Sequence, residues 1–173
     1  IERFGALTEK QVYELPSVFA ERVRYLPADL TPFPGRFSWE RFPYFKKIVD
    51  CLAPDNPVKE VVLMKGNQLG GTTAVIETVI LYNIMANPTA QAYITADAGL
   101  MKTSMQTKIE KMIDNAGARD LIFSQNRKQK GSRDTGDTAF SKEYPGGYLH
   151  CFGSRAPARF RSMSYRVIMA DEV

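Results

Sequence analysis

The 173-residue chain has an ordinary globular composition, with 44% hydrophobic and 24% charged residues. No apolar run approaches the roughly 20 residues of a membrane span, and IERFGALTEK at the start has no apolar segment of a secretory signal. The net charge of +4 is compatible with a polyanionic partner. Cys51 and Cys151 form no C-x-x-C pair, which predicts buried small side chains in a reducing compartment rather than a zinc site or disulfide.

The first part of the chain predicts an arm followed by a helix. Residues 1–36 are weakly periodic and end in Pro32, Pro34 and Gly35, so we expect a loop or arm there. Residues 38–52 carry apolar positions at helical spacing, with Ser38 as the N-cap.

Further along, strand-like and helix-like patterns alternate. Strands are expected at 59–65, 91–97 and 165–172, helices at 72–88 and 98–117, and a hairpin at 139–153. Such alternation predicts an α/β fold built on a mostly parallel β-sheet flanked by helices.

The stretch KGNQLGGTT (65–73) lies between an expected strand and an expected helix. Loop N–H groups and a helix N-terminus can hold phosphate there, and Gly66, Gly70 and Gly71 permit close backbone approach. In the motif G-x-x-x-x-G-K-[ST], Thr72 takes the place of the Mg²⁺-binding hydroxyl. The motif's lysine would stand at Gly71, so only Lys65 could supply the cation. The alternative is a glycine-rich turn with an exposed lysine.

A second motif ends the chain. RVIMADE (166–172) is an apolar strand followed by two acids. Asp171 at the strand's carboxyl end can hold Mg²⁺, and Glu172 can polarise an attacking water. Because ligands collect at the carboxyl ends of parallel strands, both motifs could reach one magnesium-nucleotide. Together they predict a nucleoside triphosphatase.

Over roughly residues 34–173, the sequence resembles the large terminase subunits of tailed bacteriophages, especially the lambda-type group. FPYFKKIVDCLAPDNPVKEVVLMKGNQLGGTT resembles that family's Pro-Tyr helix, strand and variant Walker A loop, in which an early lysine is characteristic. ITADAGLMKTSMQTKIEKMID resembles the next strand and helix, and PGGYLHCFGSRAPARFRSMSYRVIMADEV resembles the segment that ends in Walker B. Many members carry lysines at both loop positions, whereas Gly71 replaces the second one here.

The resemblance implies a P-loop NTPase fold of the ASCE type and specific residue roles. Lys65 would neutralise phosphate charge, Thr72 and Asp171 would bind Mg²⁺, and Glu172 would be the catalytic carboxylate. Gln68 would contact phosphate or orient Lys65, while Tyr44 would either stack on the base or pack in the core. The expected ATP-binding residues are Tyr44, Lys65, Gly66, Asn67, Gln68, Leu69, Gly70, Gly71, Thr72 and Thr73.

Arginines before Walker B are candidates for neutralising transition-state charge. By resemblance Arg161 is the first choice, acting in trans from a neighbouring subunit, with a surface or DNA-contacting role as the alternative. The other arginines there are Arg155, Arg159 and Arg166. Contacts to DNA phosphates are expected from Arg127, Lys128, Lys130 and Arg133. His150 is expected to be structural.

The resulting hypothesis is a Mg²⁺-dependent ATPase that packages viral double-stranded DNA into a procapsid. We expect an arm at 1–36 and an ATPase domain at 37–173 that is cut off at Walker B, without the endonuclease domain of the full-length protein. Expected partners are DNA, the portal protein, the small terminase subunit and further copies in a ring, in the host cytoplasm at the portal, without a membrane. The alternatives are a helicase-like translocase and a nucleotide-binding assembly module without turnover.

Overall fold

A five-stranded mixed sheet forms the centre of the fold. The computed structural model describes residues 13–66, 68–123, 137–138, 140–155 and 163–172. The sheet order is β4-β5-β6-β3-β7, with strands at Asp137–Thr138 (β4), Ser141–Tyr144 (β5), Gly147–Gly153 (β6), Gln91–Thr95 (β3) and Val167–Asp171 (β7). β6 and β7 both pair parallel to β3, while β4, β5 and β6 pair antiparallel.

The fold is therefore α/β, as predicted, but the expectation of a mostly parallel sheet was wrong. Tyr144 pairs with Gly147, so the predicted hairpin closes through the two residues Pro145 and Gly146. A connection this short can join only antiparallel strands. Gly146 has φ 86°, a left-handed conformation that glycine adopts without strain.

The three predicted helical segments are present in modified form. Ser38 accepts a hydrogen bond from the Glu40 amide, as expected of a cap, but Pro43 starts a new helix after a single 3₁₀ turn. The remaining two segments each contain a π-helical turn, and Gly117 with φ 68° follows the second. The elements are 3₁₀ turn Trp39–Arg41, α3 (Pro43–Asp50), π turn Thr72–Ile76, α4 (Glu77–Met85), α5 (Ala98–Ser104), π turn Met105–Ile109, α6 (Glu110–Asn115) and 3₁₀ turn Arg119–Leu121.

Residues 59–65 do not form the strand predicted for them. None of the described strands pairs with this segment, and a β-strand exists only through such pairing. The period of two is nevertheless present. Leu63 packs against the core, while Val62 and Met64 on either side of it are 82% and 100% exposed.

Part of the expected N-terminal arm contributes to the main core. Residues Pro16–Val23 form α2, followed by the antiparallel pair β1 (Tyr25–Leu26) and β2 (Gly35–Arg36). Phe19 and Ala20 of α2 are fully buried in the same cluster as the side chains of α4. The Trp39 indole also donates to the Ser17 carbonyl at 2.8 Å, which fixes α2 against the segment before α3.

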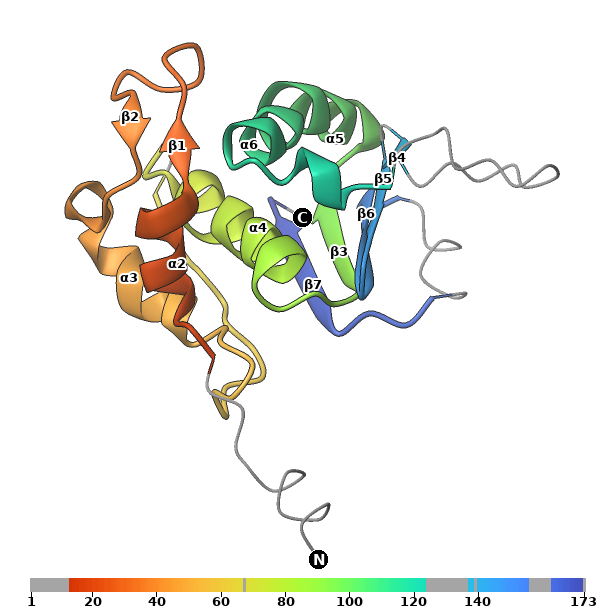
Figure 1. Cartoon of the computed structure of the whole chain (residues 1–173), viewed down its shortest axis with the longest axis horizontal. Coiled ribbons are helices and arrows are strands. Elements are labelled where there is room, and N and C mark those ends of the chain that lie inside the picture. Colours follow the sequence, from red (N-terminus) through yellow and green to blue (C-terminus); the bar gives the residue numbers. More distant parts are fainter. Residues whose placement is uncertain (1–12, 67, 124–136, 139, 156–162, 173) are drawn as a thin grey trace, which may run out of the picture.

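The elements form layers in which α4 lies between the α2–α3 pair and the sheet (Figure 1). Tyr93, Leu149, Cys151 and Met169 of the sheet join the helices in the main core. The opposite face carries a smaller cluster in which Tyr165 packs on Ala92, Ile94 and Phe152. In the described part of the chain, none of the helices has the length and hydropathy to cross a bilayer.

The two cysteines provide a test of this core. Iodoacetamide should alkylate Cys51 in the folded protein and Cys151 only after unfolding, because Cys151 is buried and Cys51 is partly exposed. Burial also raises the pKa of the Cys151 thiol, which suppresses the reactive thiolate. Peptide mass spectrometry before and after denaturation measures this difference. Equal labelling of the two thiols in the native protein would contradict the structure.

Candidate functional site

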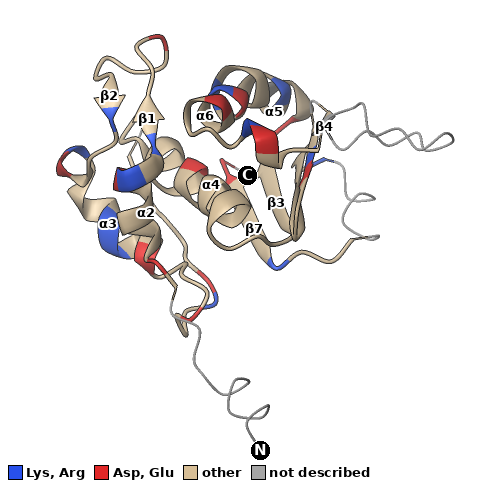
Figure 2. Ribbon diagram, in the orientation of Figure 1, with Lys and Arg blue, Asp and Glu red and all other residues tan. Residues whose placement is uncertain are grey.

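The carboxyl ends of the three parallel strands lie at one level. Thr95 at the end of β3 is in register with both Gly153 of β6 and Asp171 of β7. β3 and β7 are uncharged along most of their length, and acids stand at the carboxyl end of β7, near the C label (Figure 2). This edge is where an α/β sheet accommodates ligands.

The structure brings together the two motifs found in the sequence. The Thr72 hydroxyl donates to Asp171 Oδ2 at 2.6 Å, although the residues are 99 positions apart. The Tyr93 hydroxyl lies 3.5 Å from the same oxygen. Burial, reinforced by the Asp171 carboxylate, raises the pKa of Tyr93, so its hydroxyl stays protonated at neutral pH and can donate. The residue pair Thr72–Asp171 therefore joins the glycine-rich loop to the acidic strand end.

Beside this pair is a cavity of about 230 Å³. Glu172 lines it and has φ 55°, an uncommon conformation for a residue with a side chain, often seen at functional sites. The described residues contain no group of three or more His, Cys, Asp or Glu side chains that could hold a metal by themselves. The lining residues are Thr72, Tyr93, Thr95, Ala96, Thr103, Ser104, Thr107, Lys108, Asp171 and Glu172.

The Lys65 side chain lies across Gly71, where the motif G-x-x-x-x-G-K-[ST] has its lysine. A Cβ atom on Gly71 would come within 2.6 Å of Lys65 Cδ and 2.7 Å of Lys65 Cε. Real Cβ atoms do not approach so closely, so the Lys65 stem fills the space over Gly71. Because Gly71 has no side chain, the stem of Lys65 can occupy the space above it.

Three aromatic side chains at the start of α3 support the loop. Phe42 leaves no room for a side chain on Gly70, where a Cβ would be 2.4 Å from its ring and φ is 78°. Phe45 borders Gly71. The Tyr44 hydroxyl donates to the Leu69 carbonyl at 3.0 Å, while its ring remains 50% exposed. Tyr44 therefore contacts the loop through its hydroxyl and leaves part of its ring accessible.

A buried ion pair connects Arg24, which lies between α2 and β1, to the helix that follows the loop. The Arg24 side chain is nine-tenths or more buried and donates to Glu77 at 2.7 Å, to the Thr78 hydroxyl at 2.7 Å and to the Thr73 carbonyl at 2.6 Å. Its guanidinium also lies 4.7 Å from the centre of the Phe37 ring. Burial lowers the pKa of Arg24, and the Glu77 carboxylate opposes this effect. Through these bonds Arg24 stabilises the first helical turns after Thr72.

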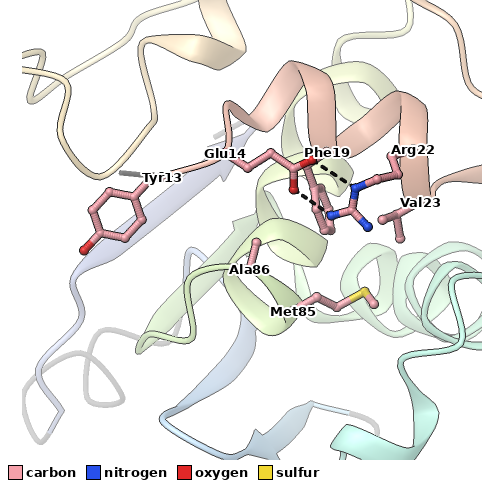
Figure 3. A pocket seen from close by; sticks show the side chains of 7 residues that line it. All are labelled: Tyr13, Glu14, Phe19, Arg22, Val23, Met85 and Ala86. Carbon is pink, nitrogen blue, oxygen red and sulfur yellow. Dashed lines mark hydrogen bonds and ion pairs between the residues drawn. The ribbon is translucent and has the colours of Figure 1, made fainter. Parts of the chain in front are cut away.

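A second, larger cavity of about 360 Å³ lies elsewhere, between α2 and the end of α4 (Figure 3). Its arginine, Arg22, is already engaged by both carboxylate oxygens of Glu14, at 2.9 and 2.6 Å. The remaining lining is mostly apolar, with Phe19, Val23 and Met85 among its residues. This cavity therefore offers little to a phosphate, and the smaller cavity is the candidate site.

Several predicted site residues cannot be placed. Asn67, Arg161, Arg159 and the basic residues Arg127, Lys128, Lys130 and Arg133 lie outside the described residues. Gln68 has φ 58° and is exposed on the loop. Arg155 and Arg166 are exposed. His150 Nδ1 is 3.0 Å from the Tyr165 hydroxyl, on the sheet face opposite the main core, which agrees with a structural role.

Sequence reasoning missed the second wall of the cavity. Thr103, Ser104, Thr107 and Lys108 lie in a segment whose pattern is that of an ordinary amphipathic helix. Nothing in that pattern distinguishes them from solvent-facing residues. The buried partners Arg24 and Glu77 gave no signal either, because their pairing depends on contacts between distant segments.

The Arg24–Glu77 pair yields a stability prediction. Arg24→Ala should lower the free energy of unfolding by about 3–5 kcal/mol, since it leaves the Glu77 carboxylate buried without a cation. Arg22→Ala removes an exposed pair two residues earlier in the chain and should cost at most about 1 kcal/mol. Chemical denaturation followed by circular dichroism measures both. Equal losses of unfolding free energy for the two substitutions would show that the buried pair stabilises the fold no more than the exposed pair does.

Comparison with known proteins agrees with this geometry. The family model described as "Phage terminase large subunit gpA, ATPase domain" matches residues 31–173. No curated protein and no solved structure gives a match. The matched range includes the glycine-rich loop, the aromatic residues that support it, Thr72 and both acids of the strand end. The chain belongs to the family of phage terminase large subunit ATPase domains.

Proposed function

We propose that the chain hydrolyses ATP to drive viral double-stranded DNA into a procapsid. The observation that carries the proposal is the 2.6 Å hydrogen bond between Thr72 and Asp171 at the carboxyl ends of parallel strands. Membership of the terminase ATPase family supports ATP as the nucleotide. A P-loop NTPase fold of the ASCE type is part of this proposal.

The Thr72–Asp171 pair fits a magnesium ion. Mg²⁺ prefers oxygen ligands and is commonly held by one or two carboxylates together with phosphate oxygens and water. Thr72 Oγ1 and Asp171 Oδ2 already lie side by side, so these two side chains would hold the ion. When bound, Mg²⁺ neutralises charge on the phosphate oxygens.

The phosphates themselves would be held by the loop. Its amide groups and the N-terminus of the following helix attract anions, and Lys65 would place its ammonium group over the phosphates from its path above Gly71. Gln68 and Thr73 would contact the same groups from within the loop. The accessible part of the Tyr44 ring is suited to stacking on the base.

Glu172 would orient the attacking water and accept its proton at a carboxylate oxygen. Its place on the cavity wall next to Asp171 supports this role, and general bases of this kind commonly accelerate reactions about 10²–10⁴-fold. Arg161 of a neighbouring copy in a ring would neutralise charge in the transition state. Arg127, Lys128, Lys130 and Arg133 would contact DNA phosphates, which makes binding salt-dependent and independent of sequence.

The remaining parts of the proposal follow from the family. A packaging motor works at the portal of the procapsid, so we propose the portal protein and the small terminase subunit as partners in the host cytoplasm.

The roles of Lys65 and Glu172 can be tested by ATP hydrolysis in the presence of Mg²⁺ and double-stranded DNA. Lys65→Ala and Glu172→Gln should each lower kcat by about 10²-fold or more, because each removes a group that acts on the reacting phosphate or water. Lys59→Ala, an exposed lysine shortly before the loop, should have little effect. Wild-type protein that binds ATP without hydrolysing it would instead indicate a nucleotide-binding assembly module.

The crossing of Lys65 over Gly71 yields a separate test. Gly71→Ala should weaken ATP binding, because the added Cβ displaces the Lys65 stem. In a Lys65→Ala background that stem is gone, so Gly71→Ala should have little further effect. Equilibrium titration of the two single variants and the double variant measures this coupling. Additive losses would show that position 71 acts independently of Lys65.

A further inference from the structure

One face of a helix contributes a wall of the cavity. Thr103, Ser104, Thr107 and Lys108, from α5 and the π turn after it, share this cavity with Thr72 and the two acids. The other face of the same helix is anchored by Met101, Met105 and Ile109, which are fully buried. This anchoring fixes Lys108 on the side of the cavity.

Lys108 provides the positive charge on this wall. Among the described residues that line the cavity it is the one cation, and it shares the cavity with the two carboxylates Asp171 and Glu172. Lys65 does not line this cavity, and its stem runs over Gly71. An incoming phosphate would therefore meet an excess of negative charge if Lys108 were absent.

Three neighbouring cations are engaged elsewhere, whereas Lys108 is not. Lys111 pairs with Asp29, Lys142 with Glu110, and Arg119 with Glu110 and Asp114. Within the described part of the chain no hydrogen bond or ion pair engages the half-buried Lys108. A lysine held half-buried at a cavity without a partner can donate to an anionic ligand.

Two of the three hydroxyl groups on this wall, those of Thr103 and Thr107, are already used as donors. Thr103 Oγ1 donates to the Gly99 carbonyl at 3.1 Å, and Thr107 Oγ1 donates to the Thr103 carbonyl at 2.7 Å. Both bonds lie within the helix, so these threonines have no hydroxyl proton left for a ligand. The ammonium group of Lys108 is thus the strongest donor that this wall offers.

We propose that Lys108 contacts the terminal phosphoryl group of the bound nucleotide, from the helical wall of the cavity and within the same subunit. The cavity of about 230 Å³ is smaller than the roughly 300–1,000 Å³ of sites that enclose a whole ligand. It therefore suits the end of a triphosphate rather than the base or sugar. This inference rests on the proposed ATPase function and adds to it a second lysine that acts in cis.

The test compares a nucleotide that has the terminal phosphate with one that lacks it. Lys108→Ala should bind the β,γ-imido analogue of ATP about 10- to 100-fold more weakly than the wild type, the loss expected for a charge-assisted hydrogen bond. Its affinity for ADP should stay within about twofold, as an ADP molecule does not reach the lysine. Lys108→Arg keeps the charge and should retain most of the affinity for the analogue.

Lys102→Ala is the matched control, because Lys102 is exposed on the same helix and does not line the cavity. Unchanged ADP binding also shows that the Lys108 variant is folded. Equal losses for both nucleotides, or analogue binding like that of the wild type, would overturn the inference. A lower kcat with unchanged analogue affinity would also overturn it and indicate an action on Glu172.

These outcomes separate the inference from the function on which it rests. If the wild type binds and hydrolyses ATP but Lys108→Ala binds the analogue normally, only the role of Lys108 fails. If the wild type binds neither nucleotide in the presence of Mg²⁺, the ATPase function itself fails.

Discussion

The parallel pairing of β3 with β6 and β7 is the constraint on which the site depends. Because parallel strands end at the same edge, Thr95, Gly153 and Asp171 lie at one level. The helix after the glycine-rich loop packs on the face to which Tyr93 and Met169 contribute. Its first turn therefore meets that edge, and the Thr72 hydroxyl reaches Asp171. A shift of one residue in this register would turn Asp171 to the other face.

In the glycine-rich loop, side-chain packing places the positive charge at Lys65 rather than at position 71. Phe42 fills the space at Gly70, and the Lys65 stem fills the space at Gly71. The Phe42 ring and the left-handed φ exclude a side chain at Gly70, whereas a side chain at Gly71 would require the Lys65 stem to move. The position of the Lys65 side chain therefore depends on a glycine at position 71. The buried pair of Arg24 and Glu77 fixes the start of the helix after the loop, at the cost of burying two charges.

The cavity has two walls of different chemical character. The wall at the strand ends carries the two acids and the Thr72 hydroxyl, whereas the helical wall carries Lys108. Both walls contain a departure from regular structure: Glu172 adopts a positive φ, and the helix contains a π turn at 105–109. Such π turns often occur at functional sites, since the extra residue changes which side chains face a neighbour. Opposite charges across a small cavity suit a ligand that carries both phosphate and a metal ion.

The sequence by itself determined most of the helices, the hairpin, the strands β3 and β7, and the two motifs, because each depends on local periodicity or on a turn residue such as Gly117 or Gly146. It could not determine that residues 59–65 remain unpaired or that the sheet is mixed, since pairing depends on partners far away in the chain. It predicted Thr72 and Asp171 for one site because strand ends converge in such folds. Only the tertiary structure decided that Lys65 crosses Gly71, that Arg24 pairs with Glu77 and that Lys108 lines the same cavity as the acids. Each of these arrangements depends on how side chains pack in the folded chain, which local sequence patterns do not show.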